Sequence, residues 1–221
     1  MIDYKDIEQG TIEWHELRWG KIGGTASGGL LNNKKGVYDS NDTLLHDILS
    51  QRLEDFEPSE SFENEAMQRG HELEPFARTY ISDYVGVEFI ETGWLQSEEN
   101  ELLGLSPDGI TLDYRKACEI KCLGRKSHLE VLLSQTVPLK YIPQCIHYFT
   151  INDKLEQLYF LAFRPEAPKH FIKELDLDSI VNIGTNATKY ELSIRECVEM
   201  VKENADKMLH QIIEEEAKIN F

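Results

Sequence analysis

Residues 104–122 read GLSPDGITLDYRKACEIKC, and this stretch contains the pattern that decides the fold. Ser106-Pro107-Asp108-Gly109 is a turn sequence, which would bring Asp108 to the mouth of a hairpin whose return strand carries Glu119 and Lys121. Because side chains alternate along a strand, Glu119 and Lys121 lie on one face and Ile120 points into the core. The hairpin therefore brings two carboxylates and an amine together.

The residue types in this hairpin favour metal-assisted hydrolysis of a phosphodiester. Two carboxylates suit a hard cation such as Mg²⁺, which takes oxygen ligands, keeps several waters and is shared with phosphate oxygens. A lysine beside them can position the attacking water or stabilise the charge that develops on phosphorus. The alternative on residue types alone is an ordinary hairpin with solvated charges.

Two other segments offer supporting side chains. RGHELEP, residues 69–75, lies on a predicted helix before the strands and presents Glu74 as a further metal ligand. Tyr141, Gln144 and Tyr148 share one face of a later predicted helix, where a neutral amide can orient water or phosphate. Each segment also has a simpler interpretation, which is a solvated glutamate for Glu74 and core packing for the helix face.

The segment before the first glycine pair predicts an anion site. Trp14 to Arg18 forms the end of a predicted helix, and Gly23-Gly24-Thr25 follows it. Arginine suits bidentate contact with phosphate, and backbone amides at a helix start add affinity for anions. The alternative is that Arg18 only complements the dipole of its own helix at the C-terminal end.

The rest of the chain predicts one α+β domain spanning residues 1–221, with a C-terminal helical segment from about residue 178 packed on it. Apolar spacing predicts helices at residues 11–19, 44–53, 61–85 and 141–150. A β-strand meander is predicted from Val87 to Leu123, with further strands in LEQLYFLAF (155–163) and HFIKELDL (170–177). Residues 178–219 are predicted to be largely helical.

Composition limits the possible partners and location. The 221 residues include 23 Lys plus Arg and 40 Asp plus Glu, so the formal charge is −17, which disfavours diffuse binding to nucleic acid or membranes. No apolar run approaches the roughly 20 residues that a bilayer span requires. The acidic N-terminus lacks the features of a secretory signal, so we expect a cytoplasmic protein with four reduced cysteines.

Five blocks of this sequence resemble the bacteriophage lambda exonuclease family, also called YqaJ-type viral recombinases, within the PD-(D/E)xK nuclease superfamily. They occur in the order of that family and span Glu13 to Phe149. The blocks are EWHELRWGKIGGT, RGHELEP, LSPDG, CEIKC and YIPQCIHYF. The resemblance implies a restriction-endonuclease-like core, in which a central mixed sheet is flanked by helices.

The resemblance also implies roles for individual residues. Asp108, Glu119 and the Ile120 carbonyl would bind metal, with Glu74 supporting a second ion. Lys121 would be the catalytic lysine, and Gln144 would hold water or phosphate. Arg18, Thr25 and Ser106 match positions where the family holds the 5′-terminal phosphate, although Ser27 competes with Thr25 for its position.

The implied activity is 5′→3′ digestion of duplex DNA ends, which leaves 3′ single strands for a partner annealing protein. Mg²⁺ is the expected cofactor, with Mn²⁺ as a substitute, and family members form ring-shaped trimers, so a homo-oligomer is expected. An acidic protein can still hold DNA if its cations line a channel, because a cleft focuses the local field. The channel candidates are Arg18, Lys21, Lys34, Lys35, Lys121, Arg125 and Lys126.

Two alternatives remain open at this point. An endonuclease of the same superfamily would have an identical core, and only the block around Arg18 distinguishes it. A non-catalytic DNA-end-binding scaffold would have kept the fold without the chemistry. Spacing of the four cysteines predicts neither an iron–sulfur cluster nor a zinc site, and Cys118 and Cys122 are expected to pack in the core.

Overall fold

The computed structural model describes residues 1–31, 42–58, 65–184 and 190–219. In these residues the helices are α1 (Ile12–Arg18), α2 (Asp42–Leu53), α3 (Glu65–Val85), α4 (Arg125–Ser134), α5 (Ile142–Ile151) and α6 (Ile194–Ile219), with short 3-10 helices η1 (Ser27–Leu30) and η2 (Leu139–Tyr141). The strands are β1 (Ile2–Asp3), β2 (Leu95–Gln96), β3 (Gly104–Leu105), β4 (Gly109–Ile110), β5 (Lys116–Cys122), β6 (Gln157–Phe163), β7 (Phe171–Leu175), β8 (Ile180–Asn182) and β9 (Glu191–Ser193).

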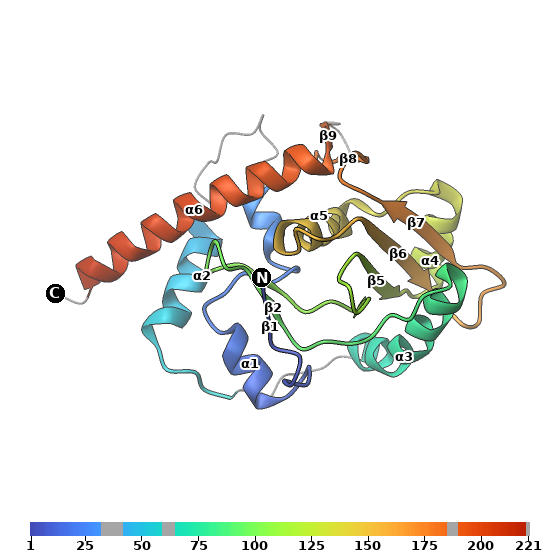
Figure 1. Cartoon of the computed structure of the whole chain (residues 1–221), viewed down its shortest axis with the longest axis horizontal. Helices are drawn as coiled ribbons and strands as arrows, with labels where there is room; N and C mark the ends of the chain where they lie inside the picture. The colour runs from blue at the N-terminus through green and yellow to red at the C-terminus, as the bar shows by residue number, and fades with distance from the viewer. Residues whose placement is uncertain (32–41, 59–64, 185–189, 220–221) are drawn as a thin grey trace.

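The central sheet has the order β4-β5-β6-β7 and is mixed (Figure 1). Strand β5 runs parallel to β6, with Glu119 opposite Phe160 and Lys121 opposite Ala162, whereas β4 and β7 pair antiparallel to their neighbours. A parallel pair needs a long crossover, and α4, η2 and α5 supply it between β5 and β6. The mixed sheet flanked by helices, which the resemblance implied, is confirmed.

Side-chain alternation along β5 divides its residues between two apolar layers. Cys118 and Ile120 are buried with Ala77 and Ile81 of α3. Ala117 instead belongs to the larger core, which contains Phe160 and Ala162 of β6 and most of α5. Glu119 and Lys121 share the side of Ala117 by strand alternation, so their charged groups enter the layer between the sheet and α5.

The helices at the two ends of the chain pack around this core. Thr11 caps α1, since its hydroxyl accepts a hydrogen bond from the backbone N of Trp14 at 3.3 Å, and the chain turns at Gly20, where φ is +68°. Helix α6 packs on α5, α2 and η1, and its C-terminal half projects beyond the body of the molecule in Figure 1. The predicted helices at 11–19, 44–53 and 141–150 are confirmed within one or two residues.

The predicted meander from Val87 is only partly correct. Strands β2 and β3 pair with β1 in a separate sheet, and β4 and β5 alone form the predicted hairpin. The N-terminal segment lies against the backbone at residue 93. A Cβ on Gly93 would be 1.9 Å from the Ile7 carbonyl oxygen, so only glycine leaves room for this contact. Sequence patterning did not indicate this partner, since β1 is short and follows no apolar alternation.

Two further segments differ from the prediction. Residues 180–182 and 191–193 form the β8–β9 pair, and the helix begins only at Ile194, where Ser193 and Glu196 bond reciprocally as a capping box. Helix α4 was not predicted. Ser61, the expected start of α3, lies outside the described residues, in which the helix begins at Glu65. Within the described ranges, we find no helix long and apolar enough to cross a membrane.

His147 links α5 to β3 inside the core and predicts a specific pH dependence. It is 0% exposed, and its Nε2 donates to the Gly104 carbonyl oxygen at 2.8 Å. Burial lowers the pKa of His147 to about 4, whereas an unfolded histidine titrates near about 6.5. Between these pH values the histidine binds a proton in the unfolded chain but not in the native state. The free energy of unfolding therefore falls as pH drops from about 6.5 toward 4, by up to roughly 3 kcal/mol.

We therefore expect His147→Gln to flatten this part of the stability profile. Urea unfolding at pH 7.5 and at pH 5 should show a smaller loss of unfolding free energy on acidification for the variant than for the wild type. The exposed His46 on α2 provides the control, since His46→Gln should leave the pH difference unchanged. Equal acid sensitivity of wild type and His147→Gln would contradict this account.

Candidate active site

The β4–β5 hairpin sets Asp108 beside the middle of β5, as the turn sequence predicted. Gly109 pairs with Cys118 and Ile110 with Ala117, so Asp108 lies one step beyond the ladder, level with Glu119. Its Oδ2 accepts a hydrogen bond from the backbone N of Ile120 at 2.6 Å. Glycine is required at 109, because a Cβ there would lie 2.7 Å from Cys118 Sγ.

Glu119 and Lys121 form an ion pair in the layer under α5. Glu119 is 2% exposed, and Lys121 Nζ lies 2.5 Å from its Oε1, an oxygen that has no hydrogen bond of normal geometry. Burial lowers the pKa of Lys121, but the negative charges of Glu119 and Asp108 outweigh it, so the net shift is upward. Lys121 is therefore a permanent cation near neutral pH.

Asp108 is held in an environment that opposes its charge. Desolvation raises the pKa of its carboxyl group well above the usual range, and the nearby charge of Glu119 raises it further. Lys121 acts in the opposite direction but faces two carboxylates. The site therefore concentrates more negative charge than its single lysine neutralises, which a bound cation would relieve.

Tyr148 of α5 fixes the hairpin from the other side. Its hydroxyl accepts from the backbone N of Asp108 and donates to the carbonyl oxygen of Cys118, both at 3.0 Å. Tyr148, one of the three residues of the predicted helix face, thus has a structural role. Tyr141 belongs to η2 instead, and its ring centroid lies 5.5 Å from Lys121 Nζ.

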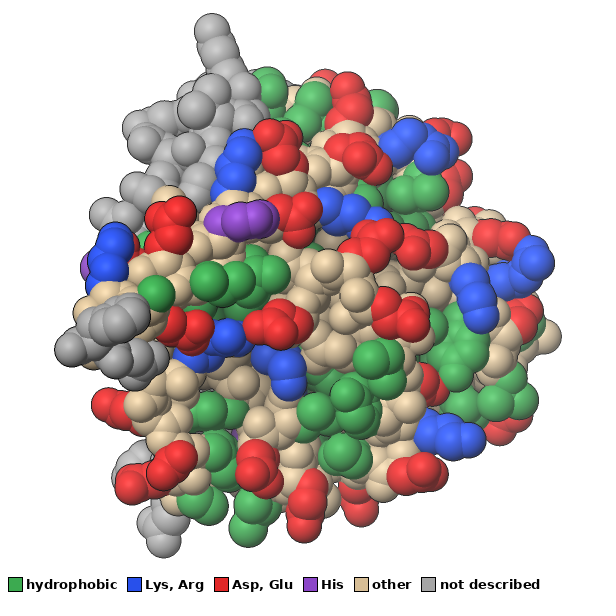
Figure 2. All heavy atoms as spheres, turned by 60° about the vertical axis from the view of Figure 1, so that its left-hand side comes forward, with side chains coloured by type: hydrophobic (Ala, Val, Ile, Leu, Met, Phe, Trp, Pro, Cys, Tyr) green, Lys and Arg blue, Asp and Glu red, His purple; other side chains and the backbone are tan. Residues whose placement is uncertain are grey.

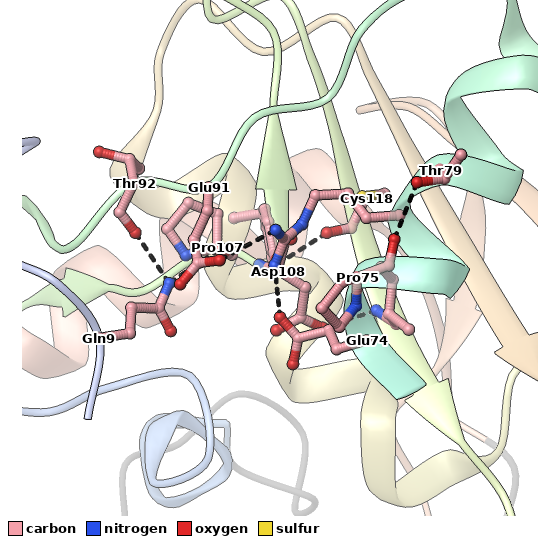
Figure 3. A network of polar contacts seen from close by, with 12 residues as sticks. Gln9, Glu74, Pro75, Thr79, Glu91, Thr92, Pro107, Asp108 and Cys118 are labelled. Atoms are coloured by element: carbon pink, nitrogen blue, oxygen red, sulfur yellow. Dashed lines mark hydrogen bonds and ion pairs between the residues drawn. The ribbon is translucent and has the colours of Figure 1, made fainter. Parts of the chain in front are cut away.

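Arg78 of α3 joins the acidic residues around the hairpin, and sequence analysis missed it. Its Nε donates to the Asp108 carbonyl oxygen at 2.6 Å, Nη2 to Glu74 Oε1 at 2.7 Å, and Nη1 lies 2.9 Å from Glu91 Oε2. Figure 3 shows Glu74, Glu91 and Asp108 gathered around this network. The spacing of Glu74 and Arg78, four residues apart on a helix, was the available signal.

The donor set fits a hard cation at Asp108 and Glu119. Both supply carboxylate oxygens, and the carboxylate of the buried Glu119 has the Lys121 ammonium beside it. Glu74 lies close enough to raise the pKa of Asp108, but one of its oxygens is bound to Arg78. In the described part of the chain, no group of three or more His, Cys, Asp or Glu side chains is already arranged around a metal position. Two carboxylates suit an ion that keeps several waters.

A second feature is the pocket of about 360 Å³ around Arg18. It is lined by His15, Arg18, Trp19, Lys21, Gly23, Thr25, Ala26 and Gln51. The Arg18 guanidinium carbon lies 3.7 Å from the Trp14 ring centroid and 5.6 Å from that of Trp94. Two indoles therefore hold its planar group, which is a cation–π arrangement.

Arg18 has a charge that no acidic side chain neutralises within the described residues. Burial alone lowers the pKa of Arg18 to about 10, with no opposing effect from a carboxylate. The guanidinium remains protonated at neutral pH. A half-buried, unpaired arginine at the wall of a pocket is suited to an anion, and phosphate has the matching geometry.

The hydroxyl groups expected near Arg18 are placed differently from one another. Thr25 is exposed and lines the pocket. Ser27, its competitor, is 1% exposed, and its Oγ donates to the Gly24 carbonyl oxygen at 2.6 Å. Ser106 does not line the pocket: its Oγ accepts from Trp14 Nε1 at 2.8 Å and donates to the Gly93 carbonyl oxygen at 2.7 Å.

Gln144 of α5 lies against the same loop. A Cβ on Gly24 would be 3.5 Å from Gln144 Cγ and 3.6 Å from its Nε2. Gln144 thus connects the helix that covers Glu119 and Lys121 with the loop that carries Thr25. The structure does not bring its amide into a hydrogen bond with Asp108 or Glu119.

The YqaJ-like viral recombinase domain model matches residues 13–154, more than half of the chain. The chain belongs to this family. No curated protein matches it. In solved structures, the chain is similar to an alkaline exonuclease from Laribacter hongkongensis, with 23% identity, a TM-score of 0.71 and coverage of 95% of this chain and 98% of the other.

Two further structures carry the same fold. The Laribacter enzyme in complex with dAMP aligns with a TM-score of 0.70, 23% identity and the same coverage. A phage-related exonuclease from Haemophilus somnus 129PT aligns with a TM-score of 0.57 and 14% identity over 88% of this chain and 96% of that chain. This YqaJ-like chain therefore shares the fold of these exonuclease structures, in which a mixed sheet is flanked by helices.

The remaining cationic and thiol residues of this YqaJ-like domain are placed as follows. Arg125 and Lys126 are exposed at the start of α4, and Lys21 lines the Arg18 pocket. Lys34 and Lys35 lie outside the described residues. Cys118 is buried, as expected, whereas Cys122 is only half-buried.

The repulsion between Asp108 and Glu119 predicts that Asp108→Asn changes thermal stability in opposite directions, relative to wild type, without and with metal. In EDTA, Asp108→Asn should raise the melting temperature by about 2–4 °C, on the order of 1 kcal/mol, because it removes one of two crowded like charges while an amide oxygen can still accept from Ile120. With Mg²⁺, wild type should gain stability that the variant does not.

Thermal unfolding of both proteins in EDTA and in Mg²⁺ measures this crossover. Asp83→Asn, at an exposed position of α3, makes the same chemical change away from the site and should behave as wild type. A variant that keeps the full Mg²⁺ stabilisation would exclude Asp108 as a ligand.

Proposed function

We propose that this protein is a metal-dependent deoxyribonuclease that digests duplex DNA ends in the 5′→3′ direction and leaves 3′ single strands for recombination by strand annealing. The proposal is carried by one observation: the buried Glu119 and half-buried Asp108 carboxylates, with a cationic lysine beside them, lie in the same chain as a pocket arginine that has no carboxylate partner among the described residues. Membership of the viral recombinase family and likeness to solved exonucleases support it.

In this mechanism Asp108, Glu119 and the Ile120 carbonyl would hold Mg²⁺, for which Mn²⁺ could substitute. The ion supplies Lewis-acid activation of the phosphodiester and its attacking water. Glu74 would support a second ion, with Arg78 bound to one of its oxygens. Gln144, beside the loop that carries Thr25, orients phosphate or water.

Lys121 acts as a cation rather than as a base. Since the two carboxylates raise its pKa above that of an ordinary lysine, it holds its proton at neutral and mildly alkaline pH. An ammonium group here donates hydrogen bonds to the phosphate oxygens as negative charge builds up in the transition state. It also orients the attacking water toward phosphorus.

Arg18 and Thr25 bind the 5′-terminal phosphate and set the register of cutting, and Ser106 contributes by anchoring Trp14, which stacks on Arg18. The partners are therefore duplex DNA ends and a single-strand annealing protein. A homotrimer enclosing DNA is the assembly we propose by family resemblance, and one nuclease domain with α6 packed on it is its unit.

The proposed hydrolysis is tested with linear duplex DNA beside a covalently closed circle, each in Mg²⁺ and in EDTA. We expect only the linear DNA to be lost, from its 5′ ends and only with metal. Lys121→Met should lower the rate by about 10³-fold or more, as loss of one charge-stabilising group does. Lys116→Met, on the same strand, is the control. A cut circle would indicate an endonuclease, and intact DNA would indicate a scaffold.

The end-recognition role of Arg18 predicts a preference for phosphorylated ends. Initial rates on 5′-phosphate and 5′-hydroxyl duplexes should differ for wild type, and Arg18→Gln should reduce that ratio toward one, by about tenfold or more, since it removes a charged hydrogen bond to phosphate. Arg115→Gln, at an exposed arginine paired with Glu156, should keep the ratio. An unchanged ratio in Arg18→Gln would remove Arg18 from this role.

A further inference from the structure

Two arginines outside the expected site share one carboxylate near the end of β5. Arg69 Nη2 donates to both oxygens of Glu166 at 3.1 Å, and Arg164 Nη2 lies 3.4 Å from Glu166 Oε2. Arg69 belongs to α3, whereas Arg164 and Glu166 follow β6 directly. We call the two arginines the Arg69–Arg164 pair and Glu166 its counterion.

This pair lies at the end of β5 that carries Lys121. Arg164 Nη1 is 3.4 Å from the Leu123 carbonyl oxygen, and the backbone N of Leu123 donates to the Phe163 carbonyl oxygen at 3.2 Å. Leu123 comes two residues after Lys121 on the chain. On α3, Arg69 precedes Glu74 by about one and a half helical turns.

The charge balance here differs from that at Arg52 and Arg78, two other arginines with little exposure. Arg78 contacts Glu74 and Glu91, and Arg52 contacts Glu101 and Glu216, so each has two carboxylates. Among the described residues, the two guanidinium groups of the pair share one carboxylate, which leaves excess positive charge there in a chain whose formal charge is −17. On the face seen in Figure 2, acidic side chains are scattered among fewer basic ones.

The counterion is the exchangeable part of this arrangement. The Glu166 side chain is 56% exposed, compared with 32% for Arg69 and 17% for Arg164. Exposed ion pairs contribute little to stability, so a competing anion can replace the carboxylate at low cost. Two guanidinium forks that converge on one anion match the oxygens of a phosphodiester group.

We propose that Arg69 and Arg164 bind a backbone phosphate of DNA beside the scissile bond, and that Glu166 occupies this position until DNA displaces it. The inference rests on the proposed function, since it assumes that DNA enters the site at Lys121. It adds a phosphate contact separate from the Arg18 pocket, and it makes Arg69 and Arg164 positioning residues. Glu166 then lowers affinity for DNA.

Binding of a short fluorescent duplex with a 5′-phosphate, measured by anisotropy in EDTA to prevent cutting, tests the site. Glu166→Gln should tighten binding by roughly three- to tenfold. Arg69→Ala should weaken it by a similar factor and reduce the slope of log affinity against log salt by about one, the signature of one lost phosphate contact. In Mg²⁺ the same variants should change KM and leave kcat near the wild-type value.

The exposed pair of Arg195 and Asp178 provides matched controls, and neither Arg195→Ala nor Asp178→Asn should change affinity or salt slope. If Glu166→Gln binds DNA no better than Asp178→Asn, or if Arg69→Ala keeps the wild-type salt slope, the phosphate site is excluded while the proposed function stands. A wild-type protein that neither binds nor cuts DNA in any of these conditions would overturn both.

Discussion

The hydrogen bond from the backbone N of Ile120 to Asp108 Oδ2 is the contact on which the site depends. It ties a carboxylate from the turn to the strand that carries Glu119 and Lys121, at a point where the regular ladder of β4 and β5 has ended. The hydroxyl of Tyr148 repeats the connection from α5 through Asp108 N and Cys118 O. The sheet and its covering helix therefore fix Asp108 through backbone groups, and its remaining oxygen stays free for other chemistry.

This arrangement places charge where the fold would otherwise be apolar. Glu119 is 2% exposed, and its strand neighbours Ala117 and Cys118 are fully buried. Burying like charges raises the free energy of the native state unless a cation compensates them. Lys121 compensates part of the negative charge through its ion pair with Glu119, and Arg78 forms an ion pair with Glu74. The site thus keeps an excess of negative charge that a bound cation would relieve, which is what the proposed metal-dependent hydrolysis would require.

Much of this could be predicted from local sequence, because the deciding pattern is local. A turn followed by alternation specifies that Asp108, Glu119 and Lys121 converge and that Ile120 points into the core, and the structure confirms that geometry. The roles assigned to these residues remain predictions. The contact of Arg78 with Glu74 had a local signal in their spacing, but its contacts with Glu91 and Asp108 did not, because these residues lie outside α3. The Arg69–Arg164 pair was not predicted, because Arg69 on α3 meets Glu166 after β6 only once the chain has folded. Strand β1 and the β8–β9 pair were missed for a different reason, since a strand of two or three residues has no periodicity to detect.

The acidic composition can be reconciled with a DNA substrate through the placement of the cations. Arg18 has no carboxylate partner among the described residues, and the Arg69–Arg164 pair has one for two charges, whereas most other described arginines are neutralised by glutamate. A field that is repulsive over most of the surface and attractive at a few points favours end-on approach over binding along the duplex. Under the proposed function, only a free DNA end would offer a terminal phosphate to the Arg18 pocket, so the acidic exterior would contribute to selectivity for ends.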